Sequence, residues 1–298
     1  MKQRILVIVG PTSSGKSALA VELARTFKGE VISADSRQVY RGLNIGTGKI
    51  KKREMRGVRH HLLDVADPKK LYTAEDYRKA ATRAIADIAR RGKLPIIAGG
   101  TGFYIDALVG RITLSAVPPN KKLRMRLEKK TAPQLYALLK KQDPRRAKTI
   151  DEHNKRRLIR ALEIAVAIGR SPQAAPLPAE YDVLWIGIMP PKKTLDAKIS
   201  ARLSARMREG MIAEARGLHQ HGLTYKRMAG LGLEYRALAR LLQKEITEHE
   251  CKEELLRDIR QYAKRQITYW KRNTDIRWFE PARMRAISKV IHVWTSGR

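Results

Sequence analysis

The chain has 298 residues, of which 43% are hydrophobic and 6% aromatic, enough for a mainly aliphatic core in one large domain or two unequal ones. Its single cysteine, Cys251, excludes a disulfide framework and a cysteine-rich zinc site. Lys and Arg total 62 against 29 Asp and Glu, and this net charge of +33 favours a polyanionic partner, nucleic acid or an acidic membrane surface, over an ordinary solvated basic surface.

Targeting and membrane segments are not expected. No apolar run approaches the roughly 20 residues that span a bilayer. The N-terminus leads directly into a strand-like run, which leaves no room for a signal or transit peptide. We therefore expect a cytoplasmic protein.

Strands and helices are expected to alternate in the first third of the chain. The expected strands are residues 4–9, 30–34, 62–65 and 94–98. A helix should follow Ser17, and a second should start at the capping box of Thr73 and Asp76 and end at Gly92. This alternation predicts a parallel sheet covered by helices on both faces.

The pattern changes near Pro118. Residues 120–170 are basic and helical, and Pro172, Pro176 and Pro178 form a linker. A strand is expected again at 183–188, followed by a mostly helical stretch at 195–272 and short strands at 277–279 and 290–294. We predict an α/β fold, a P-loop NTPase-like core formed by 1–117 and 179–298, with an all-helical insertion at 118–178.

A phosphate-binding loop joins the first strand to the first helix. Residues 10–17 read GPTSSGKS and match G-x-x-x-x-G-K-[ST], so Gly10, Thr12, Ser13, Ser14 and Gly15 should shape a loop whose backbone N–H groups surround phosphate. Lys16 should bridge terminal phosphate oxygens, and Ser17 should offer its hydroxyl to Mg²⁺. Kinases, ATPases and GTPases share this loop, so it leaves the reaction open.

A carboxylate follows the second strand, in the run DSRQVY at 35–40. Asp35 at the carboxyl end of a strand beside a phosphate loop should face the ligand crevice, where it could bind Mg²⁺ or act as a general base. The alternative is a helix-cap or turn residue, because Asp-Ser is good capping chemistry.

Several motifs in chain order make the sequence resemble the tRNA dimethylallyltransferases, also called tRNA isopentenyltransferases. They are GPTSSGKS at 10–17, DSRQVY at 35–40, GTGK at 46–49, HHLLDV at 60–65, GGTGFY at 99–104, RLIRALE at 157–163 and RQYAKRQ at 260–266. With one cysteine and an end at Arg298, the chain resembles the compact bacterial type.

The resemblance implies transfer of a dimethylallyl group from dimethylallyl diphosphate to N6 of adenosine 37, next to the tRNA anticodon. The loop at 12–17 would then hold the departing diphosphate with Mg²⁺, and Asp35 would accept a proton from the amine. Thr101 would line the reaction channel. The base must leave the anticodon stem-loop stack to reach such a channel.

The same resemblance implies which residues contact tRNA. Those beside the active site are Asp35, Ser36, Arg37, Gln38 and Thr101. Those in the insertion are Arg124, Arg156, Arg157, Leu158, Ile159 and Arg160.

A helical wheel of residues 257–272 gives an independent indication of RNA binding. Ile259, Tyr262, Ala263, Gln266, Ile267 and Trp270 share one face. Arg257, Arg260, Lys264 and Lys271 gather on the other. Such a row of cations suits a phosphate backbone, with Arg260 and Lys264 as candidate tRNA contacts, although an ordinary solvated face gives the same pattern.

Three alternatives stay open on the residues alone. A small-molecule P-loop kinase could use Asp64 as its Mg²⁺ ligand, but it would not need a large basic insertion. A prenyltransferase acting on free adenine nucleotides is closer in chemistry, and an RNA-binding ATPase would need a clearer acidic pair after a buried strand. His60 and His61 are expected to be hydrogen-bonding residues rather than metal ligands.

Overall fold

The computed structural model describes residues 2–169 and 180–296, which form two compact units. Unit 1 comprises Met1–Gly110 and Pro178–Arg298, and unit 2 comprises Arg111–Leu177. The linker expected at Pro172, Pro176 and Pro178 lies outside the described residues.

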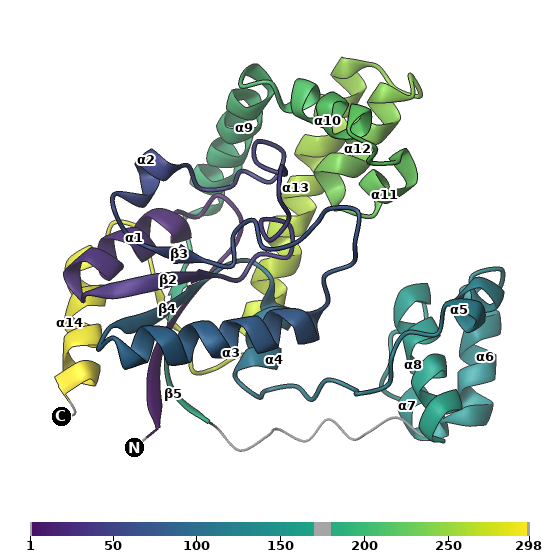
Figure 1. The fold of residues 1–298 in the computed structure, drawn as a ribbon, viewed down its shortest axis with the longest axis horizontal. Helices are drawn as coiled ribbons and strands as arrows, with labels where there is room; N and C mark the ends of the chain where they lie inside the picture. Colours follow the sequence, from purple (N-terminus) through teal and green to yellow (C-terminus); the bar gives the residue numbers. More distant parts are fainter. Residues whose placement is uncertain (1, 170–179, 297–298) are drawn as a thin grey trace. The chain divides into compact units, whose positions relative to one another are not determined.

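A six-stranded parallel sheet forms the centre of unit 1, with strand order β3-β2-β4-β1-β5-β6 (Figure 1). The strands are β1 (Gln3–Val9), β2 (Gly29–Ser33), β3 (His60–His61), β4 (Leu94–Ala98), β5 (Tyr181–Ile188) and β6 (Arg277–Phe279). Since β5 adds beside β1 after the whole of unit 2, the chain leaves and re-enters the same sheet. The predicted parallel α/β fold is confirmed.

Helices cover the sheet on both faces. Ile5, Val7 and Val9 of β1 pack with α3 (Ala74–Arg90) and α4 (Gly102–Leu108), because alternate residues of a strand point to the same face. The intervening Leu6 and Ile8 pack with α1 (Lys16–Thr26) and α14 (Met284–Ser296). The predicted capping box is present, with the Asp76 N–H donating to Thr73 Oγ1.

The remaining helices of unit 1 form a separate core beside the loop that follows β2. They are α9 (Lys192–Arg208), α10 (Met211–Gln220), α11 (Tyr225–Ala229), α12 (Leu233–Leu242) and α13 (Glu248–Lys271). Their apolar side chains pack around Val39, Tyr40 and Leu43, and Cys251 is buried there. The short α2 (Lys52–Met55) lies in the same loop region, between β2 and β3.

The described part of unit 2, residues 111–169, contains helices and no strand, as predicted for the insertion. It contains α5 (Lys121–Leu127), α6 (Ala132–Gln142), α7 (Pro144–Ala147) and α8 (Lys155–Ile168), which share a small core around Leu135, Leu139 and Leu158. Unit 2 begins at Arg111, seven residues before the expected boundary at 118.

Two expected strands are wrong. Residues 62–65 form a bend in which Leu62 and Asp64 have φ of 62° and 56°, a left-handed backbone that a strand excludes. Residues 290–294 belong to α14, where Ile287 and Ile291 are buried four residues apart on one helical face. Among the described residues, no helix combines the length and apolar character needed to cross a membrane.

Candidate active site

A cavity of about 570 Å³ opens in unit 1 at the carboxyl end of the sheet. Residues 12–18, which follow β1, line it, and so do Asp35 and Gln38 after β2 and Gly99 and Gly100 after β4. This is the edge where ligands bind in open α/β sheets, because the loops that follow neighbouring strands meet there. Of its lining, the sequence predicted the phosphate loop, Asp35 and Gln38.

The phosphate loop takes a conformation that depends on its glycines. Gly10 has φ of 143°, and a Cβ there would lie 2.4 Å from the Ile188 carbonyl oxygen of β5. Gly15 has φ of 97° and directly precedes α1, so the loop ends at a helix N-terminus. Such an end carries partial positive charge and suits a phosphate group. Ser17 is exposed in the first turn of this helix, where its hydroxyl lies at the cavity.

Lys16 is buried at the base of this loop. Its ammonium donates to the Pro11 carbonyl oxygen at 2.5 Å. Burial lowers the pKa of Lys16 to about 7, Arg202 lowers it in the same direction, and Asp35 opposes the shift. The cavity thus holds a cation whose charge is poorly compensated, and an anion would restore its usual protonation.

One carboxylate oxygen of Asp35 stabilises the turn that follows it. Its Oδ1 accepts hydrogen bonds from the backbone N–H groups of Arg37, at 2.8 Å, and Gln38, at 3.3 Å. Among the described residues its Oδ2 has no hydrogen-bond donor, so this oxygen is free to accept a proton in the cavity. The predicted turn role of Asp35 is therefore seen at Oδ1, whereas the role as base or Mg²⁺ ligand stays a prediction for Oδ2.

Thr101 connects the ends of β4 and β2. Its Oγ1 accepts from the Ser36 N–H at 3.0 Å and lies 3.3 Å from the Ser36 hydroxyl. Gln38 lines the cavity, whereas the Arg37 guanidinium reaches the Gly230 carbonyl at 3.4 Å. The predicted residues after β2 and β4 thus lie close together, with Asp35 and Gln38 lining the cavity and Thr101, expected to line the channel, beside these lining residues rather than among them.

Sequence reasoning missed the cations on the opposite wall. Lys198, Arg202 and Arg206 of α9 line the cavity at four-residue intervals. Burial and the nearby Arg206 lower the pKa of Arg202. The Arg206 Nε and the Ser14 hydroxyl of the phosphate loop are buried with no hydrogen-bond partner among the described residues. Like charges at this spacing destabilise an isolated helix, but in the sequence alone the spacing does not differ from that of an ordinary basic helix.

The contacts of Gln266 were also missed, because the sequence placed it on an apolar helix face and at the end of the RQYAKRQ motif without a role of its own. Its Oε1 accepts from the Thr12 N–H at 2.7 Å, and its Nε2 donates to the Gly100 carbonyl at 2.9 Å. One amide from α13 therefore joins the phosphate loop to the end of β4.

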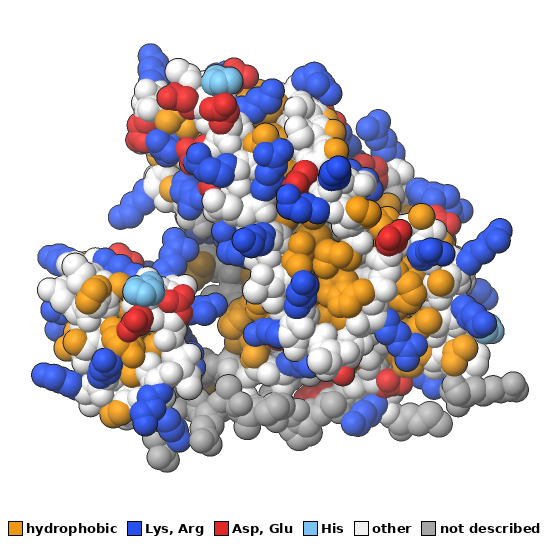
Figure 2. All heavy atoms as spheres, turned by 180° about the vertical axis from the view of Figure 1, so that it is seen from behind, with side chains coloured by type: hydrophobic (Ala, Val, Ile, Leu, Met, Phe, Trp, Pro, Cys, Tyr) orange, Lys and Arg blue, Asp and Glu red, His pale blue; other side chains and the backbone are white. Residues whose placement is uncertain are grey.

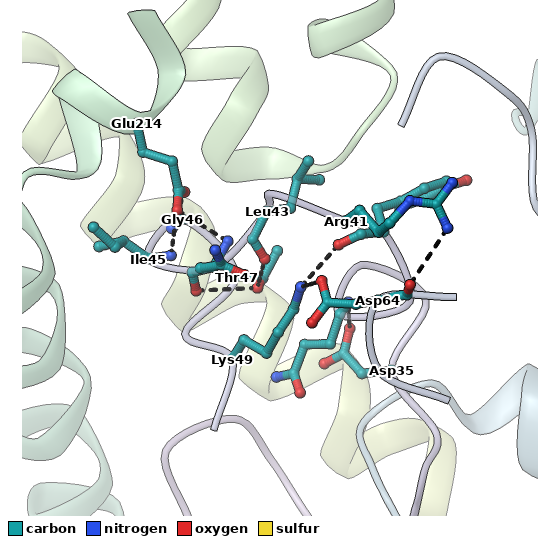
Figure 3. A network of polar contacts seen from close by, with 12 residues as sticks. Asp35, Arg41, Leu43, Ile45, Gly46, Thr47, Lys49, Asp64 and Glu214 are labelled. Atoms are coloured by element: carbon teal, nitrogen blue, oxygen red, sulfur yellow. Dashed lines mark hydrogen bonds and ion pairs between the residues drawn. The ribbon is translucent and has the colours of Figure 1, made fainter. Parts of the chain in front are cut away.

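Asp64, His60 and His61, whose roles stayed open, each have a polar partner, and both His60 and the Asp64 partner Lys49 line the cavity. Asp64 pairs with Lys49 at 2.5 Å, and the close-up in Figure 3 shows the Lys49 ammonium directed toward it. His61 contacts Glu30 at 2.7 Å, and His60 contacts the Val58 carbonyl at 2.9 Å. No group of three or more His, Cys, Asp or Glu side chains within residues 2–169 and 180–296 could hold a metal ion alone.

The predicted RNA contacts in unit 2 include both exposed and buried residues. Arg156 and Arg157 are exposed, whereas Leu158 and Ile159 are 0% and 6% exposed and belong to the core of the unit. The side chains of these two apolar residues are therefore not available for RNA, which corrects that part of the expectation.

Two further arginines of this set have internal partners. Arg124 makes two hydrogen bonds of 2.7 Å to the buried Glu163, and Arg160 donates to the Val117 carbonyl at 2.6 Å. They stabilise unit 2 while leaving about a third of each side chain exposed.

The cationic face predicted for α13 is present. Its buried residues include Ile259, Ala263, Gln266 and Trp270. Arg257, Arg260, Lys264 and Lys271 are exposed. Figure 2 shows Lys and Arg side chains spread widely over the face of the molecule that it draws.

Comparison with known proteins identifies the family. The sequence profile described as IPP transferase matches residues 38–273. The chain is 40% identical over 284 residues to "tRNA dimethylallyltransferase 1" of Geotalea uraniireducens, covering 94% of this chain and 93% of that one. It is 42% identical over 278 residues to the tRNA dimethylallyltransferase of Roseiflexus castenholzii, covering 91% of each.

Solved structures agree. The full-length tRNA isopentenylpyrophosphate transferase of Bacillus halodurans superposes with a TM-score of 0.74 at 34% identity, covering 99% of this chain and 96% of that one. A eukaryotic dimethylallyltransferase acting on tRNA gives a TM-score of 0.85 at 27% identity, covering 99% and 80%.

Proposed function

The chain belongs to the IPP transferase family, and we propose how its cavity carries out the reaction of that family. The protein is an enzyme that transfers a dimethylallyl group to adenosine 37 of tRNA. We further propose which donor and metal the enzyme uses and which residues perform each step. The observation that carries this proposal is that one cavity contains the phosphate loop, Asp35, the buried cations Lys16 and Arg206 and the half-buried Arg202.

The donor is dimethylallyl diphosphate, with its diphosphate in the phosphate loop. Lys16, Arg202 and Arg206 are buried or nearly so at this cavity, and the Ser14 hydroxyl and Arg206 Nε lack partners there among the described residues. A diphosphate supplies the negative charge and the acceptor oxygens that these groups need. It would also stabilise the charge that grows on the leaving group as the carbon–oxygen bond breaks.

Mg²⁺ fits the loop through Ser17. Magnesium keeps several waters and usually takes few protein ligands, with the rest supplied by phosphate oxygens. An exposed hydroxyl in the first turn of α1 suits that pattern, and it needs no cluster of carboxylates. When bound, the ion would neutralise charge on the departing diphosphate.

Asp35 serves as the general base. The N6 amine of adenine is a weak nucleophile, so its attack on the allylic carbon is assisted by removal of a proton. In the balanced step the N6–carbon bond forms, the carbon–oxygen bond to diphosphate breaks, and the N6 proton passes to Asp35 Oδ2. The Asp35 turn and the Thr101–Ser36 hydrogen bonds hold this carboxylate in place.

The acceptor adenosine enters from the anticodon stem-loop of tRNA. Such a base must leave its stack to reach a cavity, at a cost of a few kcal/mol. The exposed cations Arg156 and Arg157 of unit 2, and Arg260 and Lys264 of α13, would offset that cost through phosphate contacts. A tRNA acceptor also supports the cytoplasmic location expected from the sequence.

Substitutions of Asp35 and Asp64 distinguish a dimethylallyltransferase that uses Asp35 as its base from a small-molecule kinase that uses Asp64 as its Mg²⁺ ligand. Asp35→Asn should abolish transfer to tRNA while tRNA affinity stays within about twofold, because the amide keeps the turn but cannot accept the proton. Asp64→Asn is the matched control, since asparagine tolerates the left-handed backbone at this position and can still accept from Lys49. Full activity of Asp35→Asn, with loss of activity in Asp64→Asn, would overturn the assignment.

A further inference from the structure

A carboxylate from α10 binds the backbone of the loop that follows Leu43. Glu214 Oε2 accepts from the N–H groups of Asn44, at 3.0 Å, and Ile45, at 2.7 Å. Its Oε1 accepts from the Gly46 N–H at 2.9 Å and from the Tyr235 hydroxyl at 2.6 Å. Figure 3 shows Glu214 reaching down from its helix to this loop.

The same loop supports the cations of the donor site through its carbonyl groups. The Arg206 guanidinium donates to the Gly46 carbonyl at 2.8 Å, and the Arg202 guanidinium donates to the Gly48 carbonyl at 2.8 Å. Thr47, Gly48 and Lys49 line the cavity with both arginines. The loop therefore lies between a carboxylate that holds its amides and two arginines that use its carbonyls.

Little room is left for this loop to shift. A Cβ at Gly46 would lie 2.7 Å from the Tyr235 hydroxyl, and one at Gly48 would lie 2.3 Å from the Arg202 guanidinium. Lys49 fixes the far end, with its ammonium 2.8 Å from the Tyr40 carbonyl and 2.5 Å from Asp64. The loop position thus depends on contacts from helices far away in sequence.

We propose that Glu214 is a positioning residue for the donor diphosphate, which acts by holding residues 44–48 so that their carbonyls orient Arg202 and Arg206 in the cavity. This inference rests on the proposed function, because it takes diphosphate as the ligand of those arginines. Glu214 itself touches neither substrate.

The direction in which Glu214→Gln changes diphosphate affinity distinguishes a positioning role from a purely electrostatic one. Glu214→Gln removes a negative charge near a diphosphate site, and on Coulomb's law alone diphosphate would bind more tightly. The amide of glutamine, however, has only one acceptor oxygen, whereas the backbone N–H groups of the loop donate to both oxygens of Glu214. Either the Gly46 N–H or the Asn44 and Ile45 N–H groups therefore lose their acceptor. Positioning therefore predicts weaker binding, by about tenfold for one such lost hydrogen bond in a partly buried loop.

The test is calorimetric binding of inorganic diphosphate with Mg²⁺ to the whole enzyme, together with tRNA affinity and Tm. Glu253→Gln, on the exposed face of α13, is the matched control for the same chemical change. Tyr235→Phe is a second variant, which removes one donor to Glu214 and keeps the three backbone donors. It should weaken diphosphate binding by about twofold to threefold.

The expected result is weaker diphosphate binding in Glu214→Gln with tRNA affinity and the control unchanged. Equal or tighter diphosphate binding in Glu214→Gln, or a parallel loss of diphosphate and tRNA affinity, would overturn the positioning role. If Glu214→Gln does not fold, unchanged binding in Tyr235→Phe overturns it instead. Failure of the unaltered enzyme to bind diphosphate at all would overturn the proposed function and this inference together.

Discussion

The side-chain oxygen of Gln266 accepts a hydrogen bond of 2.7 Å from the backbone N–H of Thr12, across 254 positions of sequence. The amide nitrogen of the same residue donates to the Gly100 carbonyl at 2.9 Å. Because α13 also carries the exposed Arg260 and Lys264, one helix both fixes the phosphate loop and presents cations to solvent.

Gln266→Glu should lower kcat/KM for the donor by about 10-fold to 100-fold. The carboxylate can still accept from Thr12, but it cannot donate to Gly100, and its charge opposes a diphosphate beside it. Steady-state kinetics at varied donor concentration measure the effect. Gln261→Glu, on the exposed face of the same helix, is the control and should change kcat/KM less than twofold. Equal effects of the two substitutions would show that the Gln266 contacts are unimportant.

Lys16 should take up a proton when diphosphate binds at alkaline pH. Its pKa in the free enzyme is about 7, against a usual 10.5, so near pH 8.5 much of it is neutral until an anion binds. Calorimetry in two buffers of different ionisation heat measures the uptake, which Lys16→Met should abolish. Identical heats in both buffers for the unaltered enzyme would contradict this prediction.

The same pKa shift predicts how stability depends on pH. The folded pKa lies below the unfolded one, so between about pH 7 and 10.5 the unfolded chain binds more protons and the free energy of unfolding rises with pH. Below pH 7 the cost of burying the charge is fully present. Lys16→Met should therefore be more stable than the unaltered protein at pH 6, by about 1–3 kcal/mol, and the difference should shrink toward pH 10. Urea unfolding at both pH values measures it, and a constant difference would contradict the assignment.

Glu163→Gln should destabilise unit 2 by about 1–3 kcal/mol, because Arg124 and Arg160 lose a buried ionic partner. Burial alone would raise the pKa of Glu163, but hydrogen bonds from Arg124 and the Asn120 N–H outweigh it and lower the pKa. The stabilisation by Glu163 is therefore fully present above the pKa that this carboxyl has in the unfolded chain. It is lost as pH falls through the lower pKa of the folded protein.

Hydrogen exchange of α5 and α8 in the whole protein reports this change. Protection should fall in Glu163→Gln and stay unchanged in the exposed control Glu152→Gln. Unaltered protection in both helices would mean that the arginines do not depend on Glu163.

Arg157→Glu should weaken tRNA binding by about tenfold and reduce the steepness of its salt dependence, because each phosphate contact releases counterions. Arg90→Glu makes the same change of charge on α3, where Arg90 pairs with Asp87, and serves as the control. Filter binding over a salt series measures both, and diphosphate affinity should not change in either. Equal losses of tRNA affinity would indicate a general charge effect rather than a contact at Arg157.

Local sequence patterns predicted most of the sheet and the phosphate loop. Short apolar runs bounded by glycine predicted β1, β2 and β4, and the loop motif depends on neighbouring residues only. The expectation at 290–294 was wrong because β-branched residues favour strands locally, whereas burial of Ile287 and Ile291 on one face decides for a helix.

The opposite wall of the active site was beyond such patterns. Arg202, Arg206, Glu214 and Gln266 act through backbone groups more than 150 positions away, and no local propensity encodes those contacts. The regular spacing of Lys198, Arg202 and Arg206 was visible in the sequence, but it reads as an ordinary basic helix until the fold places it at the phosphate loop.

The most direct test of the central claim, that the phosphate loop holds a leaving diphosphate, is mass spectrometry of unmodified tRNA after incubation with the enzyme, dimethylallyl diphosphate and Mg²⁺. We predict a dimethylallyl mass gain on adenosine 37, with one diphosphate released for each adenosine modified. ATP should not replace the donor. No mass gain, together with ATP hydrolysis by the same preparation, would contradict the account.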